Sequence, residues 1–108
     1  MCYTIDYFNA RVLVEIERWP IGILADYLRI VELLTEFGPD LRMPHSRAMG
    51  SGLFELRPGG REGEGRALYC FASGRNIVVL HAFVKRTRTT RDRDRALARR
   101  RMKELRGG

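Results

Sequence analysis

The hydrophobic and polar positions of the chain change their period several times, and each change predicts a new element. Residues 3–8, YTIDYF, alternate aromatic or apolar with polar side chains, as a half-buried strand does. Residues 10–19 carry apolar side chains at helical spacing and follow Asn9, a residue type that caps helices. From residue 23 to residue 37 apolar side chains recur at intervals of three and four, and Gly38-Pro39 ends the run. We therefore expect a strand followed by an αα-hairpin laid over a sheet.

The middle of the chain predicts three consecutive strands. They are residues 53–57 (LFELR), 66–72 (RALYCFA) and 76–85 (NIVVLHAFVK), which are apolar or alternating segments. Residues 39–52 have no period and contain two prolines and two glycines, so we expect a loop there. Residues 58–65 (PGGREGEG) predict a flexible hairpin loop between the first two of these strands.

The last predicted element is a basic helix. Its pattern covers residues 91–105, RDRDRALARRRMKEL, and we expect the helix to span about residues 91–106. Few of its side chains are apolar, so we expect this helix to pack only weakly against the edge of the sheet. The expected order is β-α-α-β-β-β-α, a compact α+β fold whose helical hairpin packs on a mostly antiparallel four-stranded sheet. A chain of 108 residues has the length of one domain, spanning residues 1–108.

Positive charge is concentrated at the C-terminal end of the chain. The net charge is +7. Residues 1–84 carry nine Lys and Arg against ten Asp and Glu, whereas residues 85–108 carry eleven against three. This distribution favours a polyanionic partner: nucleic acid, the ribosome, an acidic protein segment or an anionic membrane. The alternative is a solvated basic helix that only improves solubility.

Several function classes lack their motifs here. The sequence contains no P-loop, no Rossmann glycine motif, and neither GxSxG nor HExxH. Cys2 and Cys70 are not in a CxxC motif, and His45 and His81 are 36 residues apart, so we expect reduced thiols, no metal and no cofactor. No apolar stretch reaches the ~18 residues of a membrane span. No signal peptide is evident, so we expect a cytoplasmic protein without a membrane partner.

Cations stand at the ends of the predicted strands. Arg57 ends the first central strand, Arg66 begins the next, and Lys85 and Arg86 end the third. If consecutive strands are antiparallel, the end of one neighbours the start of the next, so these side chains converge at one end of the sheet. Such a cluster on rigid strands suits phosphate binding. Solvent-facing arginines that protect a sheet edge are the alternative.

RNA cleavage without a metal gives these residue types distinct roles. It needs a base for the 2′-OH proton, stabilisation of the phosphorane, and an acid for the leaving 5′-oxygen. Arginine supplies the second role through bidentate contacts with phosphate, and a lysine among other cations can donate to the leaving group. Glu55, on the same strand face as Arg57, and His81, on the same strand face as Lys85, are the local candidates for the base. A histidine on an apolar strand is also typical of a core residue.

Four segments in order carry a family resemblance: GLFELR (52–57), RALYCF (66–71), LHAFVKRTRTT (80–90) and LARRRMKEL (97–105). Together they resemble the RelE/HigB toxin family, in particular the phage-derived branch of the RelE/ParE superfamily. The resemblance implies a RelE-like fold and the toxin of a type II toxin–antitoxin pair. It further implies a metal-independent, ribosome-dependent mRNA endonuclease, or mRNA interferase. Such a toxin enters the ribosomal A site, cleaves by attack of the 2′-OH and arrests translation.

The resemblance also assigns roles to residues and implies partners. Arg66 matches the arginine that stabilises the phosphorane, Arg86 the basic residue near the leaving group, and Arg57 the arginine of the ELR motif. RelE proper has a tyrosine at the start of its last helix, where this chain has Arg91 and its neighbours, so Glu55 and His81 stay open as the base. The expected partners are mRNA, the ribosome and a small antitoxin, usually of the helix-turn-helix type. The expected RNA and ribosome contacts are Arg88, Arg91, Arg99, Arg100, Arg101 and Lys103.

Two other functions stay open. ParE-like relatives on the same scaffold poison DNA gyrase by protein–protein binding and need no catalytic cations. A non-catalytic nucleic-acid-binding module is the second alternative, supported by the basic C-terminal helix. The expected convergence of Arg57, Arg66, Lys85 and Arg86 favours the nuclease over both.

Overall fold

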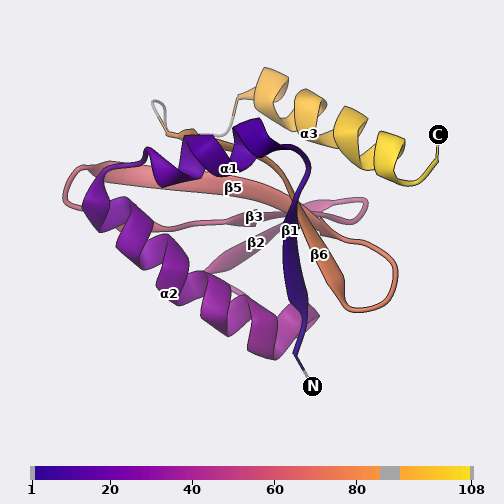
Figure 1. Cartoon of the computed structure of the whole chain (residues 1–108), viewed down its shortest axis with the longest axis horizontal. Coiled ribbons are helices and arrows are strands. Elements are labelled where there is room, and N and C mark those ends of the chain that lie inside the picture. Colours follow the sequence, from indigo (N-terminus) through magenta and orange to yellow (C-terminus); the bar gives the residue numbers. More distant parts are fainter. Residues whose placement is uncertain (1, 86–90, 108) are drawn as a thin grey trace.

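The computed structural model describes residues 2–85 and 91–107. The elements follow in the order β1 Thr4–Tyr7, α1 Ala10–Glu17, α2 Ile21–Phe37, a 3-10 turn Gly38–Asp40, β2 Ser46–Gly50, β3 Leu53–Leu56, β4 Gly59–Gly60, β5 Gly63–Phe71, β6 Asn76–Val84 and α3 Asp92–Leu105. Figure 1 shows the strands at the centre, with α1 and α2 joined by a sharp bend and α3 lying apart from them. Over these residues the fold is α+β, with three α-helices and a six-stranded, mostly antiparallel sheet.

The predicted sheet of four strands is wrong by two strands. The segment expected to be a loop over residues 39–52 contains β2, and the predicted hairpin loop over 58–65 contains β4 and the start of β5. In β2 only Ser46 is buried, so the strand has no alternating apolar pattern that a sequence reading can detect. β4 consists of two glycines. Both strands exist because β3 and β5 offer them hydrogen-bonding partners.

The strand order of the sheet is β1-β6-β5-β3-β2, with β4 paired to β5. β1 runs parallel to β6, and every other pair is antiparallel. The central pairing of β5 sets Arg66 opposite Phe83 and Leu68 opposite His81. The ends of β3 and β6 therefore meet the start of β5, where the sequence places its cations.

Both faces of the sheet are covered, which explains the unbroken burial of β5. Ala67 and Tyr69 point to one face and pack with α1 and α2. Leu68 and Cys70 point to the other face and pack with α3. Strands covered on both faces lose the alternation of apolar and polar residues that half-buried strands show.

The last helix docks on a face of the sheet and not, as predicted, at its edge. Ala98 is 0% exposed and Met102 is 6% exposed. These two side chains, one helical turn apart, contact the cluster that contains Leu68 and Leu80. Two apolar side chains, the small Ala98 and the flexible Met102, therefore pack this mostly polar helix against the sheet.

A β-bulge shapes the edge of the sheet next to the helices. Leu68 pairs with His81 and Tyr69 pairs with Val79, so Leu80 is an extra residue in β6. The backbone N–H of Phe8 donates to the Val79 carbonyl (2.9 Å), and β1 does not pair with β6 beyond this point. The Arg101 guanidinium donates to the Leu80 carbonyl (2.6 Å). A side chain of α3 thus donates a hydrogen bond to a β6 carbonyl at the point where β1 has ended.

In the described residues there is no helix with the length and apolar character that a bilayer crossing requires.

Candidate active site

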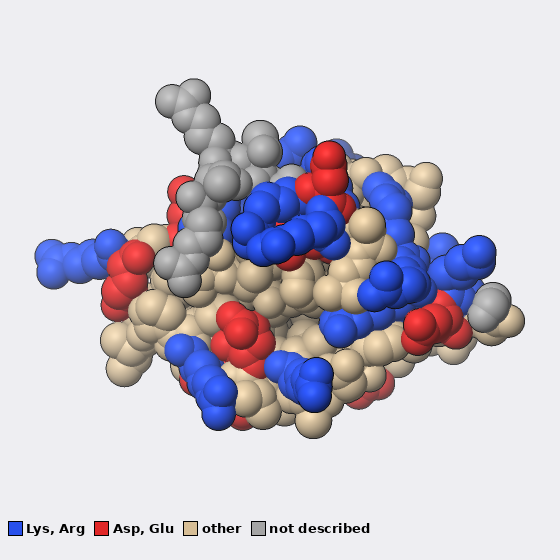
Figure 2. All heavy atoms as spheres, turned by 90° about the horizontal axis from the view of Figure 1, so that it is seen from above, with Lys and Arg blue, Asp and Glu red and all other residues tan. Residues whose placement is uncertain are grey.

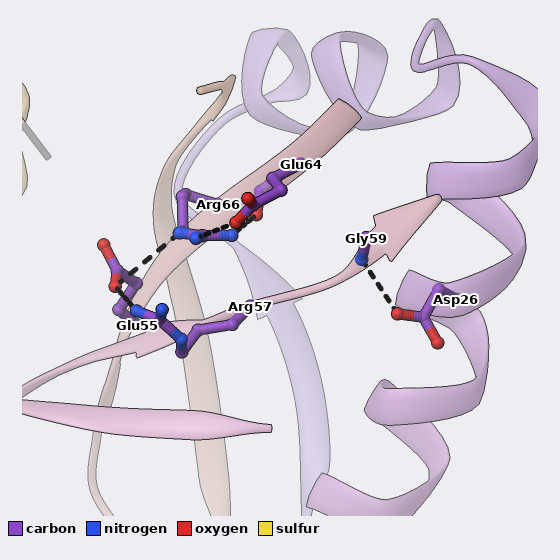
Figure 3. Close-up of polar contacts among 7 residues, drawn as sticks. Asp26, Glu55, Arg57, Gly59, Glu64 and Arg66 are labelled. Carbon is purple, nitrogen blue, oxygen red and sulfur yellow. Dashed lines mark hydrogen bonds and ion pairs between the residues drawn. The ribbon is translucent and has the colours of Figure 1, made fainter. Parts of the chain in front are cut away.

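Arg66 is at the centre of the cluster that the strand ends form (Figure 3). It begins the buried part of β5, and only 1% of its surface is exposed. Its guanidinium donates to the Gly65 carbonyl (2.7 Å) and to a carboxylate oxygen of Glu64. Its Nε also lies 3.8 Å from Oε1 of Glu55. The Arg66 guanidinium is therefore buried and lies between two carboxylates.

Glu55 links the arginines of β3 and β5. Its side chain is 0% exposed, and its Oε1 accepts a hydrogen bond from Nη1 of Arg57 (3.0 Å). The same oxygen faces Arg66. Glu55 and Arg57 share a face of β3 because they are two residues apart. A buried carboxylate needs such cations, and in return it holds both guanidiniums in place.

Three cations act on the carboxylate of Glu64, whose side chain is 56% exposed. The hydrogen bond from Arg66, together with the charge of Arg66, holds the pKa of Glu64 below its ordinary value. The charges of Lys85 and Arg57 lower the pKa of this carboxyl group further. The structure therefore brings Arg57, Arg66 and Lys85 together, as the antiparallel pairing predicts. Arg86, expected beside them, lies outside the described residues, as does Arg88.

The segment before β5 is anchored to α2, which positions Glu64 and Arg66. The Gly59 N–H donates to Oδ2 of Asp26 (2.8 Å), and the Gly22 N–H donates to Oε2 of Glu62 (3.2 Å). Gly65 packs closely against α2. A Cβ at position 65 would lie 2.9 Å from a methyl carbon of Ile23. The segment predicted to be a flexible loop is thus hydrogen-bonded to α2 through Gly59 and through Glu62.

His81 faces α3, on the same side of β6 as the cation cluster. Its Nε2 lies 2.8 Å from Oδ1 of Asp94, and its ring centroid lies 5.4 Å from that of Phe83. The His81 side chain is 19% exposed and is therefore not a fully buried core residue. Nε of Arg91 lies 3.5 Å from Oδ2 of Asp94, which accepts no hydrogen bond from a described residue. The carboxylate of Asp94 thus orients the imidazole.

The four basic side chains of α3 that the sequence predicted as RNA contacts divide into two groups. Arg99 donates to the Met49 carbonyl (2.9 Å) and to the Gly50 carbonyl (3.2 Å), so it holds the turn between β2 and β3. Arg101 donates to Leu80 and stacks over the ring of Phe8 at 5.1 Å. Arg100 and Lys103 are exposed and form no ion pair within the described part of the chain.

Figure 2 shows Lys and Arg side chains gathered on the side of the molecule where α1 and α3 lie, with some Asp and Glu side chains among them. Over residues 2–85 and 91–107, no three His, Cys, Asp or Glu side chains are grouped in a way that could hold a metal ion.

Three carboxylates of the site are absent from the sequence prediction. Glu64 has a usable signal, because residues 64 and 66 of one strand share a face. Asp26 bonds the backbone of a segment 33 residues away, and Asp94 reaches His81 only because α3 docks on the sheet face. Neither of these two contacts has a signal in local spacing.

Comparison with known proteins gives one family. The model for "Phage derived protein Gp49-like (DUF891)" matches residues 14–103, which include every described residue of the site. No curated protein matches the chain.

Proposed function

Since this chain belongs to the Gp49-like family of phage-derived proteins, which is associated with type II toxin–antitoxin systems and related to the RelE and HigB toxins, we propose that it is an mRNA-cleaving toxin. In this proposal the chain is the toxin of a type II pair and acts as a metal-independent, ribosome-dependent endonuclease. Cleavage of mRNA in the ribosomal A site then arrests translation.

The observation that carries the proposal is the carboxylate of Glu64, which is bonded to Arg66 and lies in the field of Lys85 and Arg57. The backbone N–H of Lys85 also donates to the Glu64 carbonyl (2.7 Å). Arg57, Arg66 and Lys85 all lower the pKa of this group, so the position favours a negatively charged oxygen. A phosphodiester has the same charge and presents its oxygens to guanidinium groups in the same bidentate manner. In the proposal, substrate binding displaces the exposed Glu64 and places the scissile phosphate on Arg66.

Each residue then has a chemical role. Arg66 stabilises the charge that develops on the phosphorane, and Arg57 supports it from β3. Lys85 stands beside them and donates a proton to the leaving 5′-oxygen. A metal ion is not required for this charge stabilisation, because the guanidiniums supply it from fixed positions.

We propose different roles for the two candidates for the general base. Glu55 is fully buried and bonded to Arg57, so it orients the cations and does not reach a substrate. His81 is partly exposed and has its Nε2 on Asp94, which leaves Nδ1 available for the proton of a 2′-OH. We therefore assign His81 as the base and Glu55 as a positioning residue.

The partners follow from the family and from the charge. Membership of a toxin–antitoxin family implies a cognate antitoxin. We propose that this antitoxin is a small helix-turn-helix protein and that it covers the cationic surface. The excess of eleven Lys and Arg over three Asp and Glu in residues 85–108 suits the ribosome and mRNA as the targets of the free toxin.

Induction of the chain in growing cells tests the proposal. Wild type is expected to stop protein synthesis while DNA supercoiling stays intact, and purified ribosomes with bound mRNA are expected to yield cut mRNA. Arg66→Lys keeps the buried charge but loses the bidentate contact, so cleavage is expected to fall by about 10²–10³-fold. Lys85→Gln, a change at a partly exposed residue, is expected to reduce cleavage as well.

Two controls make these results interpretable. Circular dichroism must show that both variants remain folded, since Arg66 is buried. Arg75→Gln, at an exposed site in the turn between β5 and β6, is expected to leave cleavage unchanged. If protein synthesis continues and gyrase-linked DNA breaks appear instead, the chain is a ParE-like gyrase poison. RNA binding without cleavage in any assay identifies a nucleic-acid-binding module.

A further inference from the structure

A second cationic surface lies between α1 and α3, above the open edge of β6. One hollow of about 190 Å³ is lined by residues that include Arg11, His81, Leu97 and Arg101. A neighbouring hollow of about 470 Å³ shares His81 and Leu97 and adds Arg93 and Arg100 on α3. We call these two hollows together the α1–α3 groove. The groove adjoins the cluster around Glu64 through His81, the proposed general base, and its arginines lie beyond that cluster.

The arginines of the groove are crowded and mostly unneutralised. Arg11, Arg93 and Arg100 are exposed, and none of them forms an ion pair with a described residue. Burial, and then the nearby charges of Arg100 and Arg11, lower the pKa of Arg101, while Glu104 partly offsets them. Like charges held this close repel one another, and a bound polyanion relieves the repulsion.

Each carboxylate that lines the groove has one oxygen bound to a neighbouring side chain. Oε2 of Glu15 accepts a hydrogen bond from the indole N–H of Trp19 (3.3 Å), and Asp94 binds His81. Arg101 is fixed by the Leu80 carbonyl and by the ring of Phe8. The groove therefore combines the fixed guanidinium of Arg101 with three that form no ion pair among residues 2–85 and 91–107.

The position of the groove indicates which polyanion it suits. His81 lies at its floor, and Lys85 of the cation cluster follows four residues later on the same strand, about 13 Å away by the rise of a strand. A single strand of RNA held at the cluster can therefore continue along β6 into the groove. The small apolar floor, with Leu97 and Ala82, gives little area to anchor a peptide helix.

We infer that the α1–α3 groove binds the sugar–phosphate backbone of single-stranded RNA a few nucleotides away from the phosphate held by Arg57, Arg66 and Lys85. This inference rests on the proposed function and adds to it a second contact surface for the same substrate. Arg11 and Arg100 contact phosphates from opposite sides of the groove, and Arg93 extends the contact toward the start of α3.

The test is equilibrium binding of 2′-O-methyl oligoribonucleotides, which cannot be cleaved, to the full-length protein. The double variant Arg11→Gln/Arg100→Gln is expected to bind a 12-nucleotide strand roughly tenfold more weakly than wild type. The slope of log Kd against log salt is expected to fall by about 1.4, since each phosphate contact with a single strand contributes about 0.7. A trinucleotide, too short to reach from the cluster into the groove, is expected to bind both proteins equally.

The matched control is Arg42→Gln/Arg75→Gln, which removes the same charge from two exposed arginines outside the groove. It is expected to bind the 12-nucleotide strand within about twofold of wild type. Equal binding of this strand by wild type and by the groove variant overturns the inference. A polyglutamate peptide whose binding depends on Arg11 and Arg100, with RNA binding unaffected, overturns it too and marks the groove as a protein-docking surface.

Failure of the inference and failure of the proposed function give different results. If the groove variant binds RNA like wild type while wild type still cuts mRNA, only the inference is wrong. If wild type binds no RNA and leaves translation intact, the proposed function is wrong and the inference falls with it.

Discussion

Arg66 shows how one buried side chain can be structural and functional at once. Its guanidinium lies between the buried carboxylate of Glu55 and the exposed carboxylate of Glu64. The contact with Glu55 does not compete with water, because the Glu55 side chain has no access to solvent. The second partner is at the surface, and water competes with it. An anionic substrate therefore has to replace only Glu64 to reach the arginine.

Replacement of Glu64 by Gln tests this arrangement. The pKa of Glu64 is lowered in the folded protein, so its ion pair stabilises the fold above the ordinary pKa of 4.5 and is lost as the pH falls through the lower folded value. Because the side chain is exposed, Glu64→Gln is expected to reduce the free energy of unfolding at neutral pH by at most about 1 kcal/mol. In acid the two proteins are expected to be equally stable.

Urea unfolding of both proteins across the acid range measures this difference. The same variant removes the carboxylate that competes with phosphate, so its affinity for RNA is expected to rise by up to about fivefold. A stability difference that grows in acid contradicts the ion pair, and unchanged RNA affinity contradicts the competition.

At the scale of an element, α3 is both a cover for the sheet and a source of charge. Asp94, Ala98 and Met102 face the sheet and are buried. Arg99 and Arg101 hold backbone carbonyls of the β2–β3 turn and of β6. Arg100 lies between them in sequence but points to solvent and lines the groove. Position around the helix, and not residue type, separates these roles.

The neighbouring pair Arg99 and Arg100 offers a direct comparison. Arg99→Ala is expected to reduce the free energy of unfolding by about 1 kcal/mol, because two carbonyl oxygens lose a donor. Arg100→Ala is expected to leave stability unchanged within about 0.5 kcal/mol and to weaken RNA binding. Thermal unfolding and RNA titration of the two single variants check both expectations. Equal stability losses would show that Arg99 does not anchor the turn.

At the scale of the whole molecule, the sheet depends on a helix at each face. The face under α3 contains Leu53, Leu68, Cys70 and Leu80, each at most 1% exposed. Exposure of each such side chain costs about 1.5–3 kcal/mol. The sum is comparable to the whole stability of a domain of this size. The basic helix is therefore part of the core and not a dispensable tail.

Deletion of α3 tests this dependence. A chain that ends at residue 90 is expected to lose cooperative thermal unfolding and to bind a hydrophobic dye. A chain that ends at Arg106 keeps the helix and is expected to unfold like wild type. Calorimetry and dye fluorescence of the two truncated chains separate the cases. A cooperative transition without α3 would show that the remaining sheet is stable alone.

The sequence by itself determined the order of the main helices and strands and the meeting of Arg57, Arg66 and Lys85. Helical spacing and strand alternation are local patterns. Antiparallel pairing of consecutive strands then places the end of one strand beside the start of the next. Glu55 was identified for the same reason, since it is two residues from Arg57 on one strand.

Only the tertiary structure decided the rest. β2 and β4 carry no pattern of their own and exist through their partners in the sheet. The burial of Arg66, the contact of Asp94 with His81 and the division of the α3 arginines depend on how α3 and the β4–β5 hairpin dock. These contacts join residues far apart in the chain, and their free energy comes from packing and desolvation, which no local spacing records.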